Sequence, residues 1–178
     1  MKELRLQGRY AESLYILAEE KNILDKVRED ILNIESACKE NHEFQVILKN
    51  PVIKPAIKKN IINAVFSSCE ELTLRFLTFI IEKRRELFLL GICEEFLNIY
   101  NLKHNIKVAE LTVSDDISLA VTDEIKERLA SIFASEIDLR VCKDETLVGG
   151  FTLTIDGKQY DASFKRKLAD LKKEFLLK

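Results

Sequence analysis

The chain of 178 residues is long enough for one large domain or two small ones. Hydrophobic residues make up 47% of it, which is enough for a packed core and excludes a chain that is disordered throughout. Only 5 Gly and 2 Pro stand beside abundant Lys, Glu, Leu and Ile, and this composition favours a mainly helical protein. The net charge of −2 gives no electrostatic reason to expect a nucleic-acid partner.

The sequence shows no segment that would insert into a membrane or hold a metal. No apolar run approaches the roughly 20 residues that a helix needs to span a bilayer, and the N-terminus lacks a signal-peptide or transit pattern. We therefore expect no direct membrane insertion. The four cysteines, Cys38, Cys69, Cys93 and Cys142, are widely spaced and favour reduced thiols over a metal site or disulfides. We expect neither a metal nor a cofactor.

The first hundred residues carry a succession of amphipathic helical patterns. In the first of them Tyr10, Leu14, Leu17 and Ala18 follow i, i+4, i+7, i+8 spacing, with Ala11 beside that stripe. The successive patterns, which predict about six helices, run over residues 10–18, 23–38, 44–48, 57–66, 70–82 and 87–100. These residues are therefore expected to form a helical bundle.

The fifth pattern, over residues 70–82, differs from the others because it has almost no polar face. A helix that is apolar all round is expected to be covered all round. In a domain of about a hundred residues, the cover is either the domain's own core or a surface from outside the chain. Core packing alone and an added partner explain the pattern about equally well.

The helical pattern stops at the polar segment 101–107, which we interpret as a linker. We accordingly expect two domains, a helical bundle over residues 1–104 and a small α/β domain over residues 105–178. In the second, strands are predicted at 108–113 and 137–141. The helix between them is predicted to begin at Thr122, a suitable N-cap followed by acidic residues that favour a helix start.

A third strand is predicted over residues 147–155, joined to the second by a hairpin turn at 144–146. Gly149 and Gly150 would lie within this strand, where glycines mark a bulge or a close approach by another backbone. A turn at Asp156–Gly157 follows. A final helix, capped by Asp161 or Ser163, is predicted to carry Phe164, Leu168, Leu171 and Phe175.

No nucleophile with a base, no metal-ligand spacing and no phosphate-binding loop is recognisable, so a non-catalytic interaction protein is favoured. Three segments then resemble, in the right order, the delta subunit of F-type ATP synthases, the family that includes the mitochondrial oligomycin-sensitivity-conferring protein. They are Arg9–Tyr15, Arg75–Leu77 with Glu82–Leu87, and Leu147–Phe151 with Asp161 and Ser163. Ser13 replaces a usual alanine, and Arg75 and Lys83 stand where the family pattern has asparagine.

The resemblance implies a bundle of about six helices followed by a small α/β domain. It further implies a non-catalytic stator subunit, in which the bundle grips the N-terminal helix of an alpha subunit of the headpiece between its first and fifth helices. The second domain would hold the C-terminal ends of the b subunits of the peripheral stalk, so that rotation stays coupled to ATP synthesis. The protein would then be a peripheral protein at the cytoplasmic face of a bacterial cell membrane.

Spacing adds candidates for the contact with the alpha-subunit helix. They are Tyr10, Ala11, Leu14, Phe76, Phe79 and Ile80. Which of them face the partner and which the core stays open at this point. The alternative function is a free-standing adaptor or regulatory protein built on a helical bundle.

Overall fold

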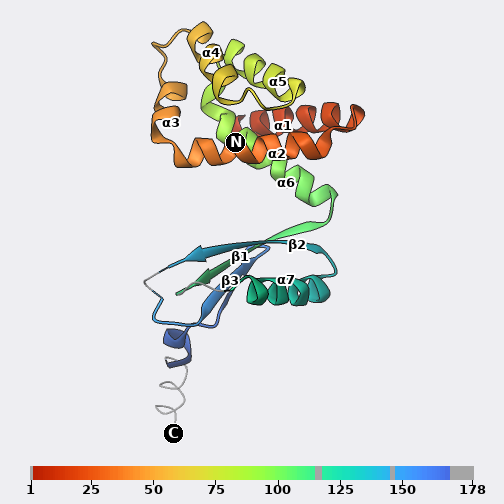
Figure 1. The fold of residues 1–178 in the computed structure, drawn as a ribbon, viewed down its shortest axis with the longest axis vertical. Helices are drawn as coiled ribbons and strands as arrows, with labels where there is room; N and C mark the ends of the chain where they lie inside the picture. The colour runs from red at the N-terminus through yellow and green to blue at the C-terminus, as the bar shows by residue number, and fades with distance from the viewer. Residues whose placement is uncertain (1, 115–117, 145–146, 169–178) are drawn as a thin grey trace. The chain divides into compact units, whose positions relative to one another are not determined.

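The computed structural model describes residues 2–114, 118–144 and 147–168. The chain forms two compact units, Met1–Tyr100 and Asn101–Lys178. The first is helical, and the second combines a small sheet with helix α7 (Figure 1). The predicted fold class, mainly α with a smaller α/β part, is confirmed.

In its described part, the first unit consists of six α-helices and a short 3₁₀ helix. They are α1 (Lys2–Glu20), α2 (Leu24–Glu40), α3 (His42–Lys49), α4 (Pro55–Val65), α5 (Glu71–Glu82), η1 (Glu86–Phe88) and α6 (Leu89–Lys103). The apolar stripes recognised in the sequence form the core. Leu14 of α1, Ile31 and Ile34 of α2 and Phe96 of α6 are all completely buried.

The second unit contains a four-stranded sheet in the order β2-β1-β3-β4. The strands are β1 (Ile106–Val113), β2 (Glu136–Lys143), β3 (Phe151–Ile155) and β4 (Lys158–Asp161), and α7 (Leu119–Phe133) connects β1 to β2. The apolar side of α7 packs on the sheet, where Leu129 joins Ala109, Ile137 and Ile155 in a small core. The buried apolar residues of the strands lie on the face that α7 covers, which explains the alternation of apolar and polar residues along the strands.

The predicted hairpin between β2 and β3 is wrong. The central strand β1 separates them, pairing in parallel with β2 and antiparallel with β3. A parallel pair needs a crossover, and α7 supplies it. Residues 145–146 of the expected turn lie outside the described residues. The hairpin is instead β3–β4 around the turn at Asp156–Gly157, and the sequence reading missed β4.

Two further predictions are corrected. Helix α7 begins at Leu119 with Ser118 as its N-cap residue, so Thr122 lies in the first turn, where its hydroxyl donates to the Ser118 carbonyl at 3.3 Å. The expected linker over 101–107 is also largely regular structure. Helix α6 continues to Lys103 and β1 begins at Ile106, because polar residues on an exposed helix end do not interrupt backbone hydrogen bonding.

Candidate functional site

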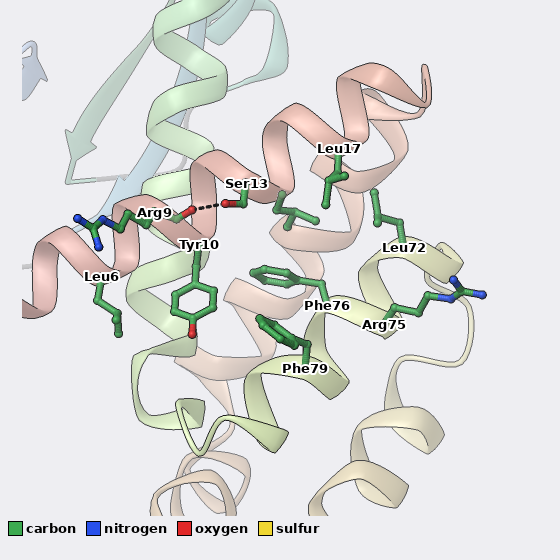
Figure 2. A pocket seen from close by; sticks show the side chains of 10 residues that line it. Leu6, Arg9, Tyr10, Ser13, Leu17, Leu72, Arg75, Phe76 and Phe79 are labelled. Atoms are coloured by element: carbon green, nitrogen blue, oxygen red, sulfur yellow. Dashed lines mark hydrogen bonds between the residues drawn. The ribbon is translucent and has the colours of Figure 1, made fainter.

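An open apolar groove runs between α1 and α5 in the first unit, with a volume of about 600 Å³ (Figure 2). Both walls are largely apolar and aromatic, and Arg9 and Arg75 are the only charged residues among those lining it. The lining residues are Leu6, Arg9, Tyr10, Ser13, Leu14 and Leu17 of α1, and Leu72, Arg75, Phe76 and Phe79 of α5.

Three aromatic rings meet across the groove. The ring centroid of Tyr10 lies 6.5 Å from that of Phe76 and 6.1 Å from that of Phe79. Figure 2 shows Tyr10 reaching from α1 toward the two phenylalanines of α5. The side chain of Phe79 is still 43% exposed, and so is that of Leu17 farther along the groove. The rings therefore contact one another while part of their apolar surface stays uncovered.

Helix α5 divides its apolar residues between two faces, which explains its unusual sequence. Leu77, Ile80 and Ile81 are each 1% exposed and belong to the core. Leu72, Phe76 and Phe79, spaced i, i+4 and i+7, belong to the groove. The helix is thus apolar on both sides without being buried on both.

The structure separates the six predicted contact residues. Tyr10, Phe76 and Phe79 line the groove, and Leu14 lines it as a fully buried residue. Ala11 and Ile80 are 0% and 1% exposed and are not among the lining residues, because they lie on the core side of their helices. The sequence reading did not propose Leu6, Arg9, Ser13, Leu17, Leu72 and Arg75. Leu6, Ser13 and Leu17 lie at i−4, i+3 and i+7 from Tyr10, and this helical spacing could have predicted that they line the groove with Tyr10.

The glycine pair of the second unit precedes β3 and does not lie within it, so the predicted strand placement is wrong. Both glycines have left-handed backbones, with φ of 123° at Gly149 and 83° at Gly150. A Cβ at position 150 would come within 2.5 Å of the Ala162 carbonyl oxygen and 2.9 Å of the Ser163 Cα. The pair therefore allows the chain before β3 to pass directly beside the segment after β4.

Asp161 and Ser163 shape that neighbouring segment. The Ser163 N–H donates to Asp161 Oδ1 at 2.9 Å, and Ser163 Oγ accepts from the Arg166 N–H at 3.3 Å, the arrangement of an N-cap. Hydrogen bonds from the side chain and backbone of Ser163 lower the pKa of Asp161 below its usual value. Ser163 caps a helical segment that is described over residues 164–168, and the predicted helix residues Leu171 and Phe175 lie outside the described residues. These hydrogen bonds fix the backbone at the start of this helical segment.

Across the described part of the chain, no group of three or more His, Cys, Asp or Glu side chains could hold a metal ion. In the same residues, no helix is both long enough and apolar enough to span a bilayer. The site with the clearest functional geometry is the α1–α5 groove.

A helical bundle with an open apolar groove, followed by a small α/β unit, defines a protein suited to binding other proteins. The chain belongs to the ATP synthase delta (OSCP) subunit family, whose sequence profile matches residues 6–175. It is therefore a structural subunit of the peripheral stalk of an F-type ATP synthase. The resemblance stated from sequence is confirmed.

Individual relatives agree with this assignment. The chain is 36% identical over 176 residues to ATP synthase subunit delta of Cytophaga hutchinsonii, covering 98% of this chain and 96% of that protein. It is 31% identical to the corresponding subunit of Carboxydothermus hydrogenoformans, covering 97% and 98% of the two chains. A chain in the Toxoplasma gondii mitochondrial ATP synthase hexamer has the same fold, with a TM-score of 0.74 at 23% identity over 96% of this chain and 97% of that chain.

Proposed function

We propose that the α1–α5 groove binds the N-terminal helix of an alpha subunit of the catalytic headpiece. The second unit binds the C-terminal ends of the b subunits, so the chain joins headpiece and stalk and stops the headpiece from turning with the rotor. It acts by binding, without catalysis of its own. Its place at the cytoplasmic face of the membrane follows from these contacts.

The observation that carries this proposal is the uncovered apolar surface of the groove. A groove lined at i, i+4 and i+7 positions accommodates the apolar face of an amphipathic helix. Phe76 and Phe79 on one wall and Tyr10 on the other are the anchors. Full burial of one large apolar side chain contributes about 1.5–3 kcal/mol, and covering the part of each anchor that is still exposed contributes a share of that.

A second apolar surface supports the contact with the stalk. Val141, Phe151 and Tyr160 are 44%, 43% and 52% exposed. Strand pairing places them on one face of the sheet, because Val141 is in register with Leu111, Leu111 with Leu153, and Leu153 with Tyr160. This is the face on which α7 packs, and in Figure 1 α7 lies against only part of it. The apolar surface that Val141, Phe151 and Tyr160 leave exposed is the part that we propose the b subunits cover.

Site-directed photo-crosslinking tests the alpha-subunit contact against the adaptor alternative. Ser13→Cys, introduced together with Cys142→Ser to remove the exposed native thiol, places a benzophenone label in the groove wall. Ser36→Cys on the exposed surface of α2 is the matched control. With purified headpiece we expect an adduct with the alpha subunit from position 13 and none from position 36. No headpiece adduct from position 13 would favour the adaptor.

A further inference from the structure

The groove has cations at its edges as well as apolar walls. Arg9 extends from α1 and Arg75 from α5, and in Figure 2 their guanidinium groups point away from the three aromatic rings in opposite directions. A third cation lies beside them, because Lys83 Nζ sits over the Phe79 ring, 5.4 Å from its centroid. None of the ten groove-lining residues is acidic.

Two acidic side chains of α5, Glu71 and Glu82, lie outside the groove lining and already form ion pairs. Glu71 pairs with Arg75 at the outer surface of α5, where the two side chains are 77% and 72% exposed. Glu82 pairs with Lys59 of α4. An exposed i, i+4 pair such as Glu71–Arg75 is weak and exchanges its partners readily. Because its pair with Glu71 is weak, Arg75 can exchange that partner for a carboxylate that a bound helix presents.

We infer that the helix bound in the groove carries acidic side chains on both sides of its apolar stripe. Those on one side pair with Arg9, and those on the other with Arg75 and Lys83. This inference rests on the proposed function and adds to it the charge pattern by which the partner is selected. Complementary charges at the rim of an interface speed association and exclude partners of the wrong sign, whereas the apolar anchors supply most of the affinity.

The cations also make this groove specific to its own complex. Arg75 and Lys83 both lie on the α5 side of the same groove. A helix whose flanks are neutral would fill the apolar part equally well. A neutral-flanked helix would gain nothing from Arg75 and Lys83. The groove should therefore bind a helix with acidic flanks more tightly than a helix with neutral flanks.

The test uses the full chain and a labelled synthetic peptide that copies the N-terminal helix of the alpha subunit from the same organism. A second peptide has every Asp and Glu of that helix replaced by Asn and Gln. Affinities are measured by fluorescence anisotropy at about 50 mM and about 500 mM salt, across which the screening of exposed charges strengthens greatly. The variant is Arg75→Asn with Lys83→Asn.

The matched control is Lys126→Asn with Arg128→Asn, which removes the same charge from α7, where Arg128 forms an equally exposed i, i+4 pair with Glu124. We expect the groove variant to weaken binding of the native peptide about 2- to 20-fold at low salt and hardly at all at high salt, while the control stays near wild type. The neutral peptide should bind all three proteins alike. Arg75→Glu with Lys83→Glu should recover binding to a peptide whose acidic residues are replaced by Lys.

Phe79→Ala, measured alongside, separates this inference from the proposed function. If Phe79→Ala weakens binding but the groove variant behaves like the α7 control, the groove binds the helix without reading its charge, and the inference is overturned. An alpha-subunit helix without acidic flanks would overturn it equally. If Phe79→Ala has no effect either, the proposed function itself fails.

Discussion

Asp30 of α2 accepts a hydrogen bond from the hydroxyl of Thr73 of α5, with 2.7 Å between Oδ2 and Oγ1. The same carboxylate oxygen accepts the backbone N–H of Glu70 at 2.9 Å. Glu70, the residue before α5, forms no capping hydrogen bond with its own side chain. Asp30 of α2 instead supplies the acceptor for the donors at the start of α5. Because both Asp30 and Thr73 are buried, this contact fixes the first turn of one groove wall.

Replacing Thr73 tests how much this contact stabilises the bundle. Thr73→Val keeps the shape of the side chain but removes a buried donor from Asp30, which should cost about 1–3 kcal/mol. Thr73→Ser keeps the donor and loses one buried methyl, which should cost about 1 kcal/mol. Urea unfolding should show the larger fall in midpoint for the valine variant, with the denaturant slope unchanged. Equal losses would show that the hydrogen bond contributes nothing.

Gly150→Ala should damage the second unit. The new methyl would meet backbone atoms of residues 162 and 163, and a left-handed alanine is itself strained, so we expect a loss of at least about 2 kcal/mol. Gly157→Ala is the control, because its φ of 72° imposes similar strain while a Cβ there meets nothing within 4 Å. Amide hydrogen exchange should show clearly faster opening of the second unit in Gly150→Ala than in Gly157→Ala. Gly150→Ala should also weaken binding to the b subunits, while binding to the headpiece should persist. Loss of both would show that the two units do not bind separate partners.

The carboxyl of Asp161 should titrate below its usual pKa of 3.8, because hydrogen bonds from Ser163 favour its ionised form. A lowered pKa in the folded state contributes stability that is present above pH 3.8 and is lost as the pH falls through the folded pKa. In Ser163→Ala, the pKa of Asp161 should rise toward its usual value, as followed by carbon NMR of the carboxyl. An unchanged pKa would rule out the Ser163 hydroxyl as the cause.

The four thiols should differ in reactivity according to burial. Burial raises the pKa of Cys38 to about 11 and of Cys69 to about 12, and it raises the pKa of Cys93 well above its usual value. Cys142, also with a raised pKa, is the exposed one of the four. Since only the thiolate reacts, alkylation at pH 7.5 should modify Cys142 first and Cys93 only on unfolding. Early modification of Cys93 would contradict its complete burial in the core of the first unit.

The sequence predicted most of the bundle, because apolar residues recur at helical spacing along each of its segments. The predictions from sequence failed where the structure depends on contacts between segments that are far apart in the chain. Strand periodicity located β1, β2 and β3, yet nothing local shows that β1 inserts between the other two. Likewise, Phe79 and Ile80 are adjacent apolar residues, and only the position of α1 and the core around α5 decides that one faces the groove and the other is buried.

The charges around the groove could not be read from the sequence for the same reason. Arg9, Arg75 and Lys83 are separated by up to 74 positions (83 − 9), and they share one groove only after α1 and α5 pack together. Lys83 belongs to a basic triplet that is typical of a solvated helix end. Its contact with Phe79 distinguishes it from its two basic neighbours.

The most direct test of the central claim is the affinity of Phe79→Ala for the alpha-subunit helix peptide, measured with its melting temperature and compared with Leu77→Ala. Phe79 faces the groove, and Leu77, two residues away, faces the core. Only the exposed 43% of Phe79 is left for a partner to cover, so we predict that Phe79→Ala weakens binding about threefold to tenfold while its melting temperature moves by only a few degrees. Leu77→Ala should instead lose about 2–5 kcal/mol of stability, with the folded protein binding normally. A Phe79→Ala protein that melts as early as Leu77→Ala, and binds the peptide as tightly as wild type when folded, would contradict the assignment of the groove as the headpiece-binding site.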